Sequence, residues 1–204
     1  MRAHSIVYTL TLLAVATASQ AQPAASAPAV TSGSIVQRDV NQEKRIEQGL
    51  QSGALNTREA AHLQREEAHV DRVEANALKD GKLSTQEKAR ITRAQNEASR
   101  DIKAAKQNDV HGNPASASSQ RMQADVQRNV NQQERIEKGV QSGALTKRET
   151  ARLEAGQARV SAKEARAGRD GHVTVAEQAR VQHAENKQSR RIRHQKHDAQ
   201  EAAK

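Results

Sequence analysis

The chain has 204 residues, a formal net charge of +9 and no cysteine, so a disulfide framework is excluded. Tyr8 is the only tyrosine, and phenylalanine and tryptophan are absent, so stacking of nucleic-acid bases on aromatic side chains is excluded in the rest of the chain. With 35% hydrophobic residues and a mean hydropathy of -0.91, apolar burial only narrowly offsets chain entropy, which favours a slender helical form or partial disorder.

The first 21 residues have the pattern of a secretory signal peptide. Arg2 supplies a short positive start, and the apolar run from Ile6 to Ala18 is too short to span a bilayer comfortably. Small residues follow, and we expect cleavage after Ala21, with Ala18 as the rival position. The mature chain is therefore expected in the periplasm or outside the cell.

An internal repeat organises the remainder of the chain. The segment QRDVNQEKRIEQGLQSGAL begins at Gln37, and QRNVNQQERIEKGVQSGAL begins 90 positions later at Gln127. The same offset places Asp80 on Asp170 without a gap, and about half of the aligned positions are identical. The sequence therefore contains a duplicated unit.

The three prolines lie outside both copies and mark linkers. Two of them are in an Ala/Pro/Ser-rich stretch, and Pro114 lies between the copies. The predicted domains are a signal peptide, 1–21; a linker, 22–35; helical repeat 1, 36–109; a flexible linker, 110–120; helical repeat 2, 121–198; and a C-terminal tail, 199–204.

Each copy is predicted to contain three helices, because apolar residues recur at helical spacing between glycine-containing turns. In the first copy the predicted apolar faces are Val36, Val40, Ile46 and Leu50 before Gly53; Leu63, Val70, Val73 and Ala77 before Gly81; and Ile91, Ala94, Ala98, Ile102 and Ala105. The predicted fold class is all-α, with two tandem three-helix repeats built as coiled-coil-like hairpins around a core of Ala, Leu, Val and Ile. Burial of an alanine-rich face against a second copy, giving a homo-oligomer, stays open.

The turn DGKLSTQE resembles the second half of an EF-hand calcium loop. With Gly81 at position 6 of the twelve-residue loop, Asp80 falls at position 5, Ser84 at position 9 and Glu87 at position 12. Asn76 would then stand at position 1. The resemblance implies helical-hairpin, EF-hand-like repeats and a weak calcium site formed by these oxygen-bearing residues.

The first half of the loop departs from the family pattern. Leu78 at position 3 has no side-chain oxygen, and Arg166 occupies position 1 in the second copy, where a cation opposes calcium. A second interpretation explains the same residues without a metal, because a left-handed glycine ends a helix and a capping box starts the next. The glycines are Gly53, Gly81, Gly143 and Gly171, and the capping residues are Asn56, Ser84, Thr146 and Thr174. We favour the turn over the metal loop.

A stripe of histidine and glutamate on the second predicted helix is a candidate metal site. His62, Glu66 and His69 fall on one helical stripe with spacing suited to a transition metal. The second copy argues against this, because its matching positions are Arg152, Gly156 and Arg159.

Basic residues gather toward the C-terminus and favour a polyanionic partner such as lipopolysaccharide, acidic lipid or nucleic acid. The candidate residues are Arg190, Arg191, Arg193 and Lys196.

An enzyme is not expected, because cysteine is absent and a narrow alanine-rich bundle leaves little room for a catalytic cleft. The sequence therefore predicts an exported, non-enzymatic helical repeat protein, structural or stress-related, that contacts an unidentified envelope protein. A polyanion-binding envelope protein and a weak calcium-binding protein are the alternatives, and no other cofactor is expected.

Overall fold

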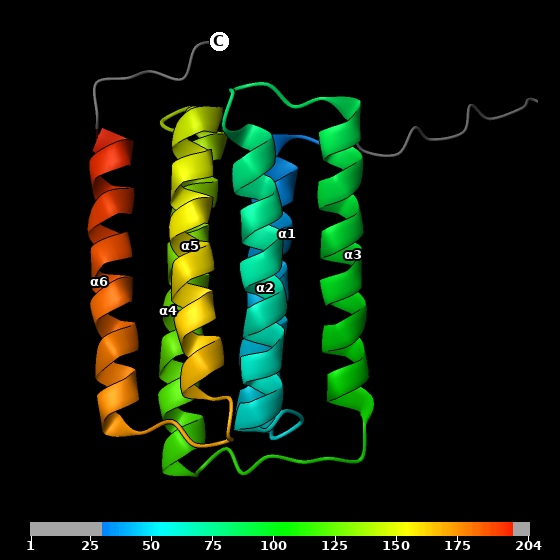
Figure 1. The fold of residues 1–204 in the computed structure, drawn as a ribbon, viewed down its shortest axis with the longest axis vertical. Helices are drawn as coiled ribbons and strands as arrows, with labels where there is room; N and C mark the ends of the chain where they lie inside the picture. The colour runs from blue at the N-terminus through cyan, green and yellow to red at the C-terminus, as the bar shows by residue number, and fades with distance from the viewer. Residues whose placement is uncertain (1–29, 198–204) are drawn as a thin grey trace, which may run out of the picture.

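The computed structural model describes residues 30–197, and every regular element in that range is an α-helix (Figure 1). The helices are α1 (Ser32–Ser52), α2 (Thr57–Leu78), α3 (Thr85–Gln107), α4 (Ala117–Gln141), α5 (Lys147–Ala167) and α6 (Val175–His197). The all-α prediction is confirmed. Within the described part of the chain, none of the helices combines the length and apolarity needed to cross a membrane. The predicted signal peptide, 1–21, and tail, 199–204, lie outside it.

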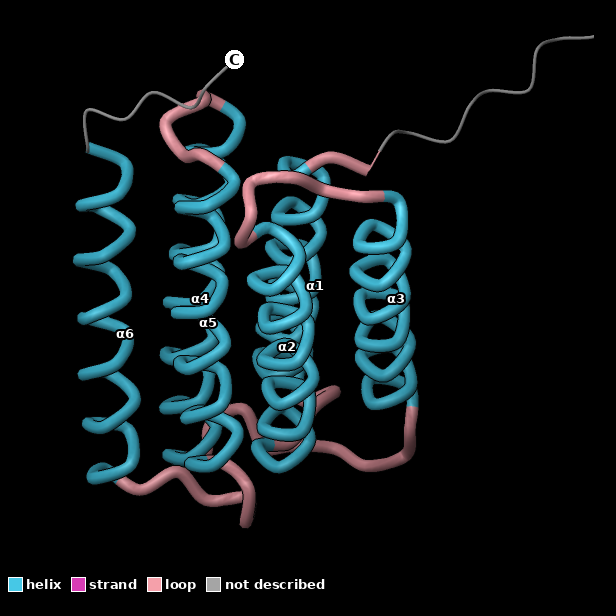
Figure 2. The backbone as a smooth tube through the Cα atoms, turned by 45° about the horizontal axis from the view of Figure 1, so that its top comes forward, coloured by secondary structure: helices cyan, strands magenta, loops and turns pink. Residues whose placement is uncertain are grey.

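Four helices form the centre of the molecule and two flank it. α2 packs against α5 and α1 against α4, while α3 lies beside α1 and α2, and α6 lies beside α4 and α5. Figures 1 and 2 show α3 and α6 on opposite outer sides. The most extensive contact, α2 with α5, joins the first half of the chain to the second. The two halves therefore share one interior, whereas the sequence suggested two units in tandem.

The turns that link the helices follow the capping pattern expected from the sequence. Gly53, Gly81, Gly143 and Gly171 all have positive φ. Asn56 opens α2, and its side chain accepts a hydrogen bond from the backbone N–H of Glu59, whose carboxylate accepts one from the N–H of Asn56. The same reciprocal pair opens α3 at Ser84 and α5 at Thr146. Glycine and capping box thus account for the helix ends without a bound ion.

The segments predicted as linkers are partly helical and partly docked. α1 begins at Ser32, inside the predicted 22–35 linker, because Thr31 caps it. The segment between α3 and α4 is held by a hydrogen bond from the N–H of Gly112 to the carbonyl O of Gly53 at 2.8 Å. A Cβ at Gly112 would collide with the carbonyl O of Leu55. This connection is therefore a fitted part of the fold, not a free tether.

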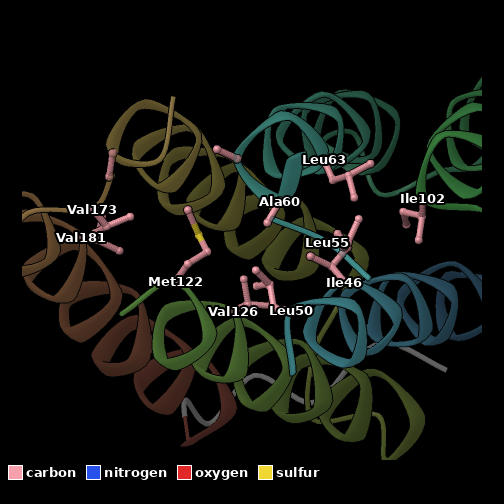
Figure 3. Close-up of a cluster of buried hydrophobic side chains, with 12 residues drawn as sticks. Ile46, Leu50, Leu55, Ala60, Leu63, Ile102, Met122, Val126, Val173 and Val181 are labelled. Atoms are coloured by element: carbon pink, nitrogen blue, oxygen red, sulfur yellow. The ribbon is translucent and has the colours of Figure 1, made fainter. Parts of the chain in front are cut away.

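Apolar side chains from all six helices and the turns between them fill the interior. The largest cluster brings Ile46 and Leu50 of α1 against Leu63 of α2 and Val126 of α4 (Figure 3). Met122, fully buried on α4, belongs to the same cluster, on the side of Val173 and Val181 (Figure 3), and was missing from the core predicted from Ala, Leu, Val and Ile. The predicted apolar faces are otherwise confirmed, with Val73 and Ala105 only partly buried.

Candidate functional site: a buried carboxyl cluster

The residues of the predicted calcium loop are spread along the α2–α3 turn. Asn76 is exposed on α2, and the Asp80 carboxylate accepts a hydrogen bond from the backbone N–H of Lys82 at 2.8 Å. The Glu87 carboxylate accepts hydrogen bonds from the N–H of Ser84 at 2.8 Å and from its hydroxyl at 2.6 Å. These bonds lower the Glu87 pKa. The turn is engaged in capping, and calcium binding there stays a prediction.

The histidine stripe does not come together as a ligand group. Within residues 30–197, one group of three acidic or histidine side chains has its ligand atoms all within 4.8 Å, and His62, Glu66 and His69 are not in it. Both histidines are exposed on α2. The structure therefore offers no support for that metal site.

The basic C-terminal residues lie along α6, with Arg190 and Arg193 exposed and Arg191 and Lys196 half-buried. Of these, Arg191 lines a groove of about 330 Å³ between α5 and α6. Arg152 and Arg159 of α5 line the same groove, together with Ala155 and Gln195. The sequence prediction omitted the two α5 arginines, although their spacing of seven residues places them on one helix face.

The feature that sequence reasoning missed is the burial of many carboxyl groups between the central helices. The acidic residues among the buried side chains are Asp39, Glu43, Glu47, Glu67, Asp71, Glu74, Asp125, Glu137, Glu149, Glu154, Glu164 and Glu185. No Lys, Arg or His between residues 30 and 197 is buried. These carboxyl groups are therefore held in an interior that contains amide and hydroxyl groups but no fully buried cation.

The centre of this cluster is formed by Asp39, Glu74 and Glu154, called here the acid triad. They come from α1, α2 and α5, and their exposures are 1%, 0% and 0%. One carboxylate oxygen of each lies within 4.8 Å of the corresponding oxygens of the other two. Helix spacing explains the burial, because Asp39 lies between Val36 and Val40 on the inward face of α1.

Amide groups from two more helices contact the acid triad. The side-chain N–H₂ of Gln95 on α3 donates to Asp39 Oδ1 at 2.8 Å and to Glu74 Oε1 at 2.9 Å. The N–H₂ of Gln133 on α4 donates to Glu154 Oε2 at 3.1 Å. These amide donors are nevertheless too few to reach all six carboxyl oxygens of the triad.

Each member of the triad keeps one oxygen without a hydrogen-bond partner, namely Asp39 Oδ2, Glu74 Oε2 and Glu154 Oε1. Every such buried side-chain atom in residues 30–197 is an oxygen. The interior therefore lacks hydrogen-bond donors, and added protons or a cation would supply what is missing.

Burial raises the pKa of these carboxyl groups, because water no longer stabilises the charged form. The pKa of Asp39 is raised to about 7 by burial, although the adjacent Glu74 carboxyl and the Gln95 amide oppose the shift. Burial and then the neighbouring Asp39 charge raise the pKa of Glu154 to about 8. The pKa of Glu74 is raised well above its ordinary value, first by burial and then by the charge of Asp39.

A second triad occupies the equivalent position in the duplicated sequence. At an offset of 90 residues, Asp39 corresponds to Asn129 and Glu74 to Glu164, while Glu154 corresponds to Gln64 of the first copy. The Asn129 amide donates to Glu164 Oε2 at 2.7 Å and to Gln64 Oε1 at 3.4 Å. This amide triad has two carboxamides where the acid triad has two carboxyls, so it carries amide donors of its own, although Asn129 Oδ1 and Glu164 Oε1 have no hydrogen-bond partner.

The signal that could have revealed the cluster is this exchange between the copies. Acidic residues on the predicted apolar stripes of one copy are replaced by amides or a hydroxyl in the other. The pairs are Asp39 with Asn129, Glu43 with Gln133, Glu67 with Gln157, Asp71 with Ser161, Glu154 with Gln64, and Glu185 with Gln95. The carboxyl-to-amide exchanges keep side-chain volume while removing charge, which is a pattern of interior positions.

Comparison of the chain with models of protein families, with curated proteins and with solved structures finds no match.

Proposed function

We propose that this chain is a non-enzymatic, acid-responsive helical protein of an exported compartment, whose interior takes up protons in mild acid and whose exposed faces meet a partner in the envelope. The proposal keeps the stress-related interaction role inferred from the sequence. The observation that supports it is the acid triad, in which three fully buried carboxyl groups from three helices each retain an oxygen without a donor.

Proton uptake links this interior to stability. In the unfolded chain Asp and Glu titrate near 3.8 and 4.5, whereas the folded-state pKa values are about 7 for Asp39 and about 8 for Glu43 and Glu154. The folded state therefore binds more protons than the unfolded state between these limits. The stability that comes from this extra proton binding is fully present below the pKa values of the unfolded chain. It is lost as pH rises through the pKa values of the folded state.

The environment of the triad contains further buried carboxyl groups, which also have raised pKa values, and one surface arginine that opposes the rise at Asp39. Glu43 of α1 and Glu67 and Asp71 of α2 are buried carboxyls whose pKa values burial raises. Arg38, at the surface of α1, opposes the shift at Asp39. α3 and α4 contribute the neutral amides of Gln95 and Gln133. The triad thus faces carboxyl groups of α1, α2 and α5 and neutral amides of α3 and α4.

The test compares the free energy of unfolding at pH 5 and pH 9. We expect the mature protein to be more stable at pH 5, by several kcal/mol summed over the cluster at about 1.4 kcal/mol for each unit of pKa shift. Unfolding is followed by far-ultraviolet circular dichroism in urea, because the mature chain has no aromatic reporter. Equal stability at the two pH values, or greater stability at pH 9, would contradict the proposal.

The duplicated sequence supplies a matched variant. Asp39→Asn with Glu154→Gln gives the acid triad the side chains of the amide triad, with permanent N–H donors in place of titrating carboxyls. We expect the double variant to be more stable than the natural chain at pH 9 and to lose part of the dependence on pH. Glu97→Gln, at an exposed position of α3, is the control and should leave the profile unchanged.

A second candidate function is polyanion binding, and the groove lined by Arg152, Arg159 and Arg191 favours it. Every buried carboxyl that is protonated removes one negative charge, while the Lys and Arg residues stay outside the interior. The charge at the surface is then more positive than the formal +9 of the sequence. This excess favours phosphate or sulfate groups on an envelope polymer or lipid.

Heparin chromatography tests this second function. Arg152→His with Arg159→His imports the residues found at the equivalent positions of the first copy, His62 and His69. At pH 7.5 the variant should elute at lower salt than the natural chain, since two cations of the groove are largely neutralised.

The control replaces two exposed arginines of α3 that have the same seven-residue spacing, Arg93→His with Arg100→His. An equal loss of retention in both variants would assign the effect to net charge and not to the groove. Point variants are preferred to removing the end of α6, because Ile192 there is fully buried.

A further inference from the structure

We propose that the acid triad of Asp39, Glu74 and Glu154 binds an oxygen-preferring divalent cation, Mn²⁺ or Ca²⁺. The inference deepens the proposed function, because cation and protons would satisfy the same oxygens. It also moves the expected metal site from the surface turn at Asp80 into the bundle.

The separations within the triad suit one shared ion. Oxygen ligands lie about 2.0 to 2.6 Å from such ions, so two ligands of one ion are at most about 5 Å apart. The three carboxylates offer oxygens that all lie within 4.8 Å of one another and come from three different helices. An ion placed among them would also offset the repulsion among three negative charges.

Gln133 supplies a second, independent observation. Its side chain is 2% exposed and reaches the triad from α4, where its N–H₂ contacts Glu154 Oε2 at 3.1 Å. The carbonyl oxygen of the same amide, Gln133 Oε1, is buried and has no hydrogen-bond partner. A carboxamide oxygen is a suitable ligand for these ions, and a half-turn of the amide about its last side-chain bond would place Oε1 where the N–H₂ now contacts Glu154.

The surrounding groups determine which class of cation fits. The triad and the amides around it offer only oxygen ligands, and no His between residues 30 and 197 is buried, which disfavours zinc and copper. Gln95 holds Asp39 Oδ1 and Glu74 Oε1 and leaves the other oxygen of each carboxyl without a partner. Such outer hydrogen bonds orient the ligands of a metal site.

The amide triad provides an internal comparison. There the Asn129 amide hydrogens occupy oxygens of Glu164 and Gln64, and one carboxylate remains where the acid triad has three. Only the acid triad combines three charged ligands, so we expect one ion for each chain. Because the site is buried, loading requires the bundle to open or to fold around the ion.

The test measures metal retained after refolding. The mature chain is unfolded with chelator, refolded at pH 8 with Mn²⁺ and passed through a desalting column, and bound manganese is counted by elemental analysis and by electron paramagnetic resonance. We expect one retained ion for each chain, an anisotropic manganese signal, and loss of the ion at pH 5, where protons compete. Parallel samples refolded with Ca²⁺ are counted in the same way.

Three variants locate the site. Asp39→Asn with Glu154→Gln should reduce retention at least tenfold, Glu74→Gln should do the same independently, and Asp80→Asn with Glu87→Gln in the surface turn should leave it unchanged. Asn129→Asp with Gln64→Glu should add a second ion. Failure of the natural chain to retain either ion would overturn the inference, as would full retention by both triad variants.

The outcomes separate the two proposals. Greater stability at pH 5 than at pH 9 without retained metal leaves the acid-responsive function standing and removes the cation. If metal is retained, but stability measured in chelator does not depend on pH, the cation site stands and the acid-responsive function is removed.

Discussion

At the scale of single residues, Gln95 determines how the acid triad is held. Its N–H₂ donates to Asp39, to Glu74 and to the carbonyl O of Ile35, at 2.8, 2.9 and 3.1 Å. Its backbone carbonyl accepts in turn from Gln42 at 2.8 Å. One amide from the flanking helix α3 is thereby fixed between α1 and α2, and two of the triad's six oxygens depend on it.

Replacing this amide with an isosteric apolar side chain tests its contribution. Gln95→Leu leaves two buried carboxyl oxygens without their donor, and we expect the free energy of unfolding at pH 7 to fall by about 1–3 kcal/mol. Chemical denaturation monitored by circular dichroism gives the value. Gln86→Leu, on the exposed first turn of α3, should change stability by less than about 0.5 kcal/mol. An unchanged free energy of unfolding in Gln95→Leu would contradict the role assigned to this amide.

At the scale of helices, apolar periodicity was enough to predict where the elements lie, and turn chemistry was enough to predict their ends. Ile46 and Leu50 face inward as their spacing requires, and Gly53 ends α1 in a left-handed conformation. The same periodicity misses the acidic residues, because charged side chains on a helix usually face water. Asp39 and Glu74 are buried because α1 and α2 each contact several helices, and no single helix reveals its neighbours.

The candidate sites divide in the same way. The turn at Ser84 and Glu87 could be interpreted from sequence, because its hydrogen bonds join residues three positions apart. The acid triad could not, since its members come from distant parts of the chain and meet only after the two copies pack. What brings them together is the α2–α5 contact, and duplication alone does not say that the copies share an interior.

At the scale of the whole molecule, the two halves should depend on each other for folding. α2 buries Leu63 and Val70 together with Glu67 and Glu74, and separation from α5 would expose part of that face to water. We expect a fragment of residues 30–109 to show reduced helicity and no cooperative thermal transition. Mixing it with a fragment of residues 110–197 should restore both signals. Cooperative unfolding of the first fragment alone, at the full chain's midpoint, would show instead that each copy is independent.

The two copies place their buried acids at different positions, and this bears on assembly. Asp71 of the first copy is matched by Ser161 of the second, and the Ser161 hydroxyl donates to Asp71 Oδ2 at 3.4 Å across the interface. Two first copies brought together across the same interface would place Asp71 against Asp71, and two second copies would place Ser161 against Ser161. Unlike halves are therefore the compatible partners. One polypeptide contains both halves, so a single chain satisfies this requirement. If two chains exchange halves, the complementarity is kept only when the first copy of one chain packs against the second copy of the other.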